Sequence, residues 1–234
     1  MSERGGNFLK NLLEVKAPFF IFNPKSYLYG QPLEELALEA DQMAEKMGVQ
    51  VFVTAPYADI ERLAHKTSHI IVTAQHLDGL EPGRGMGAVL GESIYQAGAR
   101  ATFLNHAEHP LTLTQLVKSI QKTKELGMLS IVCADSVEEA RAIATLRPDI
   151  LLCEETAQIG TGQVSDTSYV HSTIEAIHAI DPEIAVMEAA GIRSAEDVRR
   201  VIALGADGTG CTSGITQAED PASVLRSMIR ALKN

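Results

Sequence analysis

Short apolar runs alternate with longer segments of helical periodicity along nearly the whole sequence. This alternation indicates parallel strands that are buried on both faces and joined by right-handed helical crossovers. Since eight such runs fit within 234 residues, a closed (β/α)8 TIM barrel is favoured over an open, doubly wound α/β sheet. The expected strands are "FFIFN" (19–23), "VQVFVT" (49–54), "HIIVTA" (69–74), "ATFLN" (101–105), "LSIVCA" (129–134), "DILLC" (149–153), "IAVME" (184–188) and "DGTGC" (207–211).

Amphipathic helices are expected between these runs, with Ser, Thr or Pro at several starts and Gly at several ends. Such patterns cover residues 32–48, 112–127, 136–146, 194–205 and 221–232.

Ahead of the first expected strand, residues 1–16 form an expected N-terminal extension, and residues 17–234 are expected to form one catalytic domain. Within the extension, "FLKNLLEVK" (8–16) is compatible with a short amphipathic helix. We interpret this helix as a strut against the body of the protein rather than a membrane anchor.

Composition excludes several classes of partner. Thirty acidic against twenty basic side chains give a net charge of -10, and no basic block is present, so no nucleic-acid partner is expected. No secretory signal or membrane-spanning run is recognisable, which predicts a cytoplasmic protein without a membrane partner. The three cysteines, Cys133, Cys153 and Cys211, follow no metal-ligand spacing and are expected to be reduced core residues.

Polar groups gather where the expected strands end, which is where a barrel of this kind places its active site. The strand ends read "NPK", "NHAEH", "EETAQIGTG", "EAAG" and "CTSG". Amide, ammonium, imidazole and carboxylate groups on one rim, opposite loops of small residues, suit acid–base chemistry on a phosphorylated carbonyl compound.

The order and spacing of several segments resemble the triose-phosphate isomerase family, particularly its short archaeal-type form. The segments are "FNPKSYLYG", "TAQHLDGLEPG", "GESIYQAGARATFLNHAEH", "EETAQIGTG", "AAGIRSAEDVRRVIALGADG" and "SGITQAEDP", and the resemblance runs from about Ala17 onward. It implies an enzyme that interconverts glyceraldehyde 3-phosphate and dihydroxyacetone phosphate without a cofactor.

The resemblance also implies catalytic roles. The family's lysine and neighbouring asparagine match Lys25 and Asn23, and its electrophilic histidine matches His106, with Glu108 as a nearby carboxylate. The family is a well-known example of a neutral histidine paired with a glutamate base, so these roles come from the resemblance. His109 stands three residues after His106, but no third metal ligand is apparent and no metal is expected.

In the family, the glutamate that acts as the catalytic base lies six residues before the first glycine of "IGTG". Counting back from Gly160 gives Glu154, and strand alternation allows at most one of Glu154 and Glu155 to enter the barrel readily. Glu155 would then begin a closing lid. The expected phosphate-binding residues, acting through small side chains and backbone N–H groups, are Gly160, Gly191, Ser213 and Gly214.

Four positions depart from the family pattern. Glu155 replaces a lid proline, Ala107 a serine, Met86 a threonine that reaches the neighbouring subunit, and Ala189, preceded by Glu188, an expected glycine.

These departures leave alternatives open: an isomerase of another small phosphorylated sugar, such as a tetrulose phosphate, or a non-catalytic phosphate-binding barrel. The family further implies a homodimer or homotetramer, assembled through the loop of residues 76–87.

Overall fold

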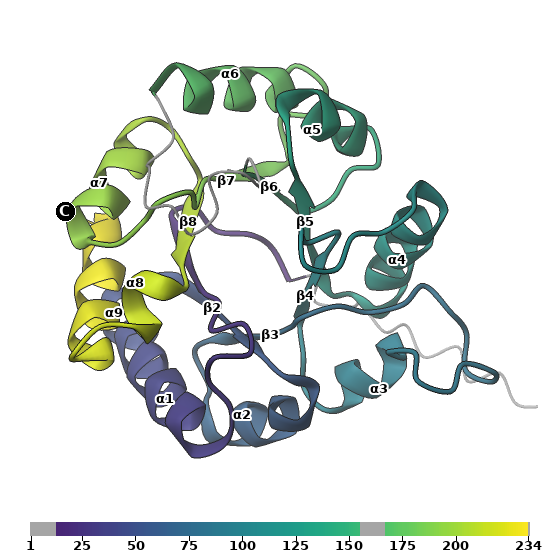
Figure 1. Cartoon of the computed structure of the whole chain (residues 1–234), viewed down its shortest axis with the longest axis horizontal. Coiled ribbons are helices and arrows are strands. Elements are labelled where there is room, and N and C mark those ends of the chain that lie inside the picture. The colour runs from purple at the N-terminus through teal and green to yellow at the C-terminus, as the bar shows by residue number, and fades with distance from the viewer. Residues whose placement is uncertain (1–12, 155–166, 234) are drawn as a thin grey trace, which may run out of the picture.

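A closed parallel barrel forms the centre of the molecule. The structure is a computed structural model that describes residues 13–154 and 167–233. Each strand pairs in parallel with the next, and β8 returns to β1, which closes the barrel (Figure 1). The strands are β1 (Phe19–Phe22), β2 (Gln50–Ala55), β3 (Ile71–Ala74), β4 (Ala101–Leu104), β5 (Leu129–Ala134), β6 (Ile150–Cys153), β7 (Ala185–Met187) and β8 (Gly208–Cys211).

Helices surround this barrel on its outside (Figure 1). Their ends follow the expected signals: Thr112 and Gln115 form a capping box at the start of α4, and Gly127 ends that helix in the left-handed region at φ 68°. The described helices are α1 (Gly30–Met47), α2 (Ile60–Lys66), α3 (Gly91–Gln96), α4 (Leu113–Leu126), α5 (Val137–Ala144), α6 (Thr167–His178), α7 (Ala195–Ala203), α8 (Ser213–Thr216) and α9 (Pro221–Arg230), with 3₁₀ turns at Tyr57–Asp59 and Ala231–Lys233.

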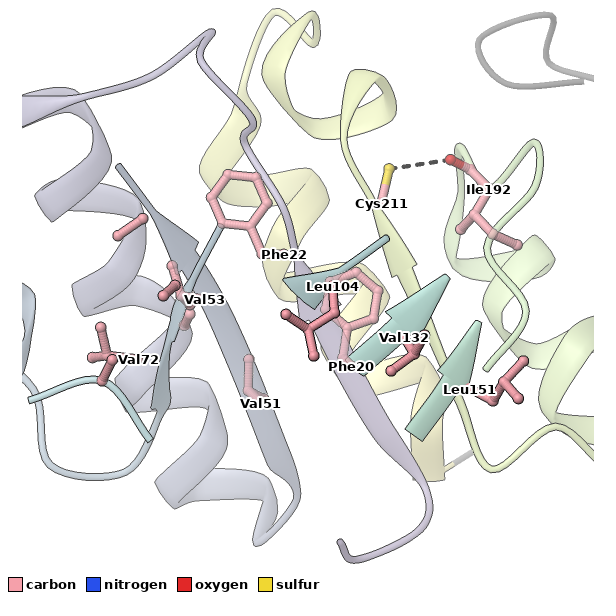
Figure 2. Close-up of a cluster of buried hydrophobic side chains, with 14 of the residues drawn as sticks. Phe20, Phe22, Val51, Val53, Val72, Leu104, Val132, Leu151, Ile192 and Cys211 are labelled. Carbon is pink, nitrogen blue, oxygen red and sulfur yellow. Dashed lines mark hydrogen bonds between the residues drawn. The ribbon is translucent and has the colours of Figure 1, made fainter. Parts of the chain in front are cut away.

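Strand alternation divides the core into two layers. Side chains such as Ile21, Phe52 and Leu152 fill the inside of the barrel. Their strand neighbours, including Val53 and Leu151, pack in the layer between barrel and helices that Figure 2 shows in part. This arrangement confirms the predicted (β/α)8 barrel, and all eight expected strands are present with ends that differ by at most two residues.

Two further expectations concern the extension and the cysteines. Residues 13–16 are not helical, so this part of the proposed helix over 8–16 was wrong, while residues 8–12 lie outside the described chain. Leu13 and Val15 instead pack against the inner core, because the open amino end of the barrel offers apolar surface there. The expectation of reduced core cysteines is confirmed, since all three are free and buried.

No helix in the described ranges is long and apolar enough to cross a membrane.

Candidate active site

A cavity of about 270 Å³ lies at the carboxyl end of the barrel strands. Loops that follow β1, β4, β6, β7 and β8 all contribute to its wall. Most of the site residues expected from the sequence therefore meet in one place, although they are far apart in the chain. These residues are Asn23, Lys25, His106, Glu108, Glu154, Gly191 and Ser213.

Lys25 is held by its neighbours on both backbone and side chain. Its backbone N–H donates to Oδ1 of Asn23 at 3.0 Å, and its carbonyl accepts from Nε2 of Gln75 at 2.9 Å. Its ammonium lies 2.6 Å from Oε1 of Glu108. This hydrogen bond is the main reason that the pKa of the Glu108 carboxyl lies below its ordinary value. The ammonium is thus fixed at the rim of the cavity.

His106 is arranged as a neutral imidazole. The backbone N–H of Glu108 donates to Nδ1 of His106 at 3.1 Å, which places the single ring proton of the neutral form on Nε2. Burial, followed by the charge of Lys25, lowers the pKa of His106, and Glu108 only partly opposes this. The ring can therefore donate a proton from Nε2 without first being a cation.

Glu154 directly follows β6, and its side chain lines the cavity. Burial raises the pKa of its carboxyl group above the ordinary value, and the positive charge of Lys25 works in the opposite direction. A partly desolvated carboxylate is a stronger base than one in water, as proton abstraction from carbon requires. Glu155 and Gly160, assigned to a lid and to phosphate binding, lie outside the described residues.

The loops after β7 and β8 form the part of the wall between Glu154, after β6, and Lys25, after β1. Sγ of Cys211 donates to the carbonyl of Ile192 at 3.1 Å, and this bond links the two loops (Figure 2). A Cβ on Gly214 would lie only 2.9 Å from the Cα of Arg193, so glycine is required there for close packing. Gly191 and Ser213 line the cavity, whereas Gly214 is not one of its lining residues.

The departures from the family pattern lie in different surroundings. Ala189 lines the cavity, Ala107 is exposed beside His106, and Met86 is fully exposed at the tip of the loop after β3.

The structure adds cavity residues that sequence reasoning missed, namely Arg193, Thr212 and Tyr27. Arg193 is the most informative, because a guanidinium is suited to binding phosphate. The sequence did offer a signal for Arg193, because it lies between "AAGI" and Ser194, the N-cap of α7. An arginine just before a helix is equally typical of a solvent-exposed helix start, so this signal was not decisive.

His109 does not form a metal centre with His106. Its ring contacts the ring of His76 in a tilted arrangement, with centroids 4.3 Å apart and 45° between the ring planes. Among the residues that the structure describes, no group of three or more side chains is arranged to hold a metal ion.

A parallel barrel with carboxylate, imidazole and ammonium groups at the carboxyl end of its strands defines a class, the (β/α)8-barrel enzymes that move protons by acid–base chemistry. The model of the family described as "Triosephosphate isomerase" matches residues 18–231 of this chain. The chain therefore belongs to the triosephosphate isomerase family.

Curated archaeal proteins are similar over most of their length. A "Triosephosphate isomerase" of Methanobacterium bryantii is 37% identical over 222 residues, covering 92% of this chain and 98% of that protein. The Methanosarcina barkeri protein of the same name is 37% identical, covering 92% and 99%. That of Sulfolobus acidocaldarius is 32% identical, covering 92% and 95%. The predicted resemblance to the family, in its archaeal form, is confirmed.

Proposed function

We propose that this chain is a triose-phosphate isomerase that interconverts D-glyceraldehyde 3-phosphate and dihydroxyacetone phosphate through an enediolate. The observation that carries the proposal is the convergence of Glu154, His106 and Lys25 on one cavity in a chain of this family. Each group has a chemical role in the isomerisation of a phosphorylated carbonyl compound.

Glu154 is the base in this proposal. Its carboxylate removes a proton from the carbon next to the carbonyl and returns it to the neighbouring carbon, so that no net proton is lost. Because only Leu152 and other apolar side chains precede it on the inner face of β6, the carboxylate stands at the edge of a dry core. This position keeps it basic.

His106 and Lys25 manage the charge that develops on oxygen. His106 donates its Nε2 proton to the enediolate and moves a proton between the two substrate oxygens. The Lys25 ammonium, bound to Glu108 in this structure, stabilises the developing negative charge once substrate is present. Gly191, Ser213 and Gly214 are proposed to hold the phosphate group, together with Gly160.

Proton exchange tests this assignment. The parent protein in heavy water should exchange the carbon-bound proton of dihydroxyacetone phosphate and form the aldehyde, as followed by NMR. Glu154→Gln should lower kcat by roughly 10³-fold, since a general base contributes on the order of 10² to 10⁴. Glu183→Gln, at an exposed position before β7, is the matched control and should retain parental activity. Equal rates in parent and Glu154→Gln would refute Glu154 as the base.

The alternatives weighed from the sequence are not favoured. The curated relatives named here share one name and cover 92% of this chain, and none is named for a longer sugar or for binding alone. The cavity also holds Glu154, His106 and Lys25, the proposed base, proton donor and cation, which supports an isomerase over a binding protein.

We further propose a homodimer or homotetramer formed through the loop of residues 76–87, and a cytoplasmic location. We retain the division into an extension, 1–16, and a catalytic barrel, 17–234. Exposure of the loop residues 81–88 supports the first of these proposals.

A further inference from the structure

Glu188 is a buried carboxyl group that the proposed mechanism does not use. The residue is 1% exposed. Neither of its side-chain oxygens has a hydrogen-bond partner within the described part of the chain. An ionised carboxylate in this condition is strongly disfavoured, because burial removes the water that would solvate it. Such a group calls for an explanation.

Strand register places Glu188 next to the proposed base. Leu152 of β6 pairs with Met187 of β7, and both side chains lie inside the barrel. The next pair in the same register is Cys153 with Glu188, and alternation turns both toward the surrounding helices. Glu154, one residue further, turns back to the cavity. Glu188 therefore lies behind the wall that carries Glu154.

The groups around Glu188 favour its protonated form. On the β6 side are the Cys153 thiol, whose Sγ lies 3.1 Å from the Tyr169 hydroxyl of α6, and the Glu154 carboxylate. On the β8 side, the backbone N–H of Glu188 donates to the carbonyl of Gly208 at 3.2 Å. Burial first, and the charge of Glu154 second, raise the pKa of Glu188 to about 8. Among the described residues, no cation offsets these effects.

We propose that Glu188 is a positioning residue for the isomerisation, holding its proton while Glu154 acts as a carboxylate and weakening substrate binding when it becomes ionised. This inference rests on the proposed function, since it takes Glu154 as the base. Two neighbouring carboxyl groups in a poorly solvated site do not readily carry charge together. A second negative charge also opposes both the phosphate dianion and the developing enediolate.

Stability as a function of pH tests the protonation of Glu188 without any substrate. The carboxyl is neutral in the folded protein and ionised in the unfolded chain between about pH 4.5 and 8, so folding takes up a proton there. The neutral variant Glu188→Gln lacks this effect. Its unfolding constant should fall relative to that of the parent by about tenfold per pH unit between pH 5 and 8, and the ratio should become constant above pH 8.

Denaturant unfolding of both proteins at several pH values measures this ratio. Glu183→Gln, which removes an exposed carboxylate just before β7, is the matched control and should show a ratio that hardly changes. A ratio that is equally flat for Glu188→Gln would overturn the proposal, because Glu188 would then be ionised in the folded protein. Glutamine has the shape of the protonated acid, so the variant is expected to fold.

Kinetics then test the coupling to the reaction. The parent kcat/KM should fall on the order of tenfold above pH 8, mainly through KM, and Glu188→Gln should lose this fall while keeping the same acid limb. Coinciding profiles in two active proteins would overturn the inference and leave the proposed function intact. A parent with no isomerase activity at any pH would instead refute the proposed function and, with it, the role of Glu188.

Discussion

At the scale of single residues, Lys25 shows how the site is prepared before substrate arrives. Its backbone has φ 50°, in the left-handed region that a lysine rarely adopts. Two hydrogen bonds hold this conformation: the Lys25 N–H donates to Oδ1 of the neighbouring Asn23, and the Lys25 carbonyl accepts from Gln75, fifty residues away. Strain of this kind persists only where the surrounding structure enforces it, and it is frequent at functional sites. Asn23 therefore helps to hold the left-handed backbone of Lys25, which explains why the two residues occur together.

Arg193 is the residue whose role is most simply tested. It lines the same cavity as Lys25 and Glu154, on the loop after β7, where a phosphate group would lie in the proposed complex. Arg193→Ala should raise KM about tenfold, equivalent to about 1.4 kcal/mol, with little change in kcat. Steady-state kinetics at low salt measure this change. Arg199→Ala removes the same charge from α7, where Arg199 pairs with Glu196, and should leave KM unchanged. An equal rise in KM for the two variants would indicate only the loss of a positive charge.

At the scale of elements, residues 13–16 connect the extension to the barrel. The backbone N–H of Lys16 donates to Oε1 of Gln50, and Nε2 of Gln50 donates to the carbonyl of Glu14, each at 3.0 Å. Leu13 and Val15 of the same segment pack against the inner core. This segment therefore covers the amino end of the barrel, on the side away from the catalytic cavity.

Removing its apolar side chains should reduce stability and spare catalysis. The double variant Leu13→Ala/Val15→Ala should lower the free energy of unfolding by about 2 kcal/mol, because both side chains are only partly buried. Denaturant unfolding measures this loss, and kcat should remain parental. Glu14→Ala, between the two, removes an exposed side chain and should change stability little. If the double variant unfolded with the same free energy as Glu14→Ala and the parent, the packing of Leu13 and Val15 would contribute nothing to stability.

At the scale of the whole molecule, the loop after β3 is the surface that suggests self-association. Residues 81–88 are exposed, and Met86 at its tip is fully exposed. Flexible methionine side chains suit contact surfaces that must adapt to a partner. This loop is also the one through which the family resemblance implies assembly.

Met86→Glu should therefore shift the protein toward monomers by placing a charge in an apolar contact. Sedimentation velocity across micromolar concentrations measures the shift. Ile180→Glu changes another exposed apolar residue, beyond the end of α6, and should leave the sedimentation coefficient unchanged. A parent that sediments as a monomer throughout this range would refute the proposed oligomer.

The barrel was predictable from the sequence, because eight doubly buried strands joined by helices have few alternative arrangements. The sequence also placed Asn23, Lys25, His106 and Glu154 at the ends of expected strands, whereas the choice of Glu154 over Glu155 depended on the spacing in the family. Their individual catalytic roles came from the family resemblance. Residues of the same types at the ends of other strands would have been equally compatible with acid–base chemistry.

The neighbours that act on these groups could be identified only from the folded chain. Strand register sets Glu188 behind Glu154, and loop packing brings Arg193 into the cavity. Both depend on which side of a strand or loop meets which partner, and residues distant in sequence determine that. The same reason explains the error at residues 13–16: their apolar spacing is compatible with a helix, but the open end of the barrel binds them in a non-helical form.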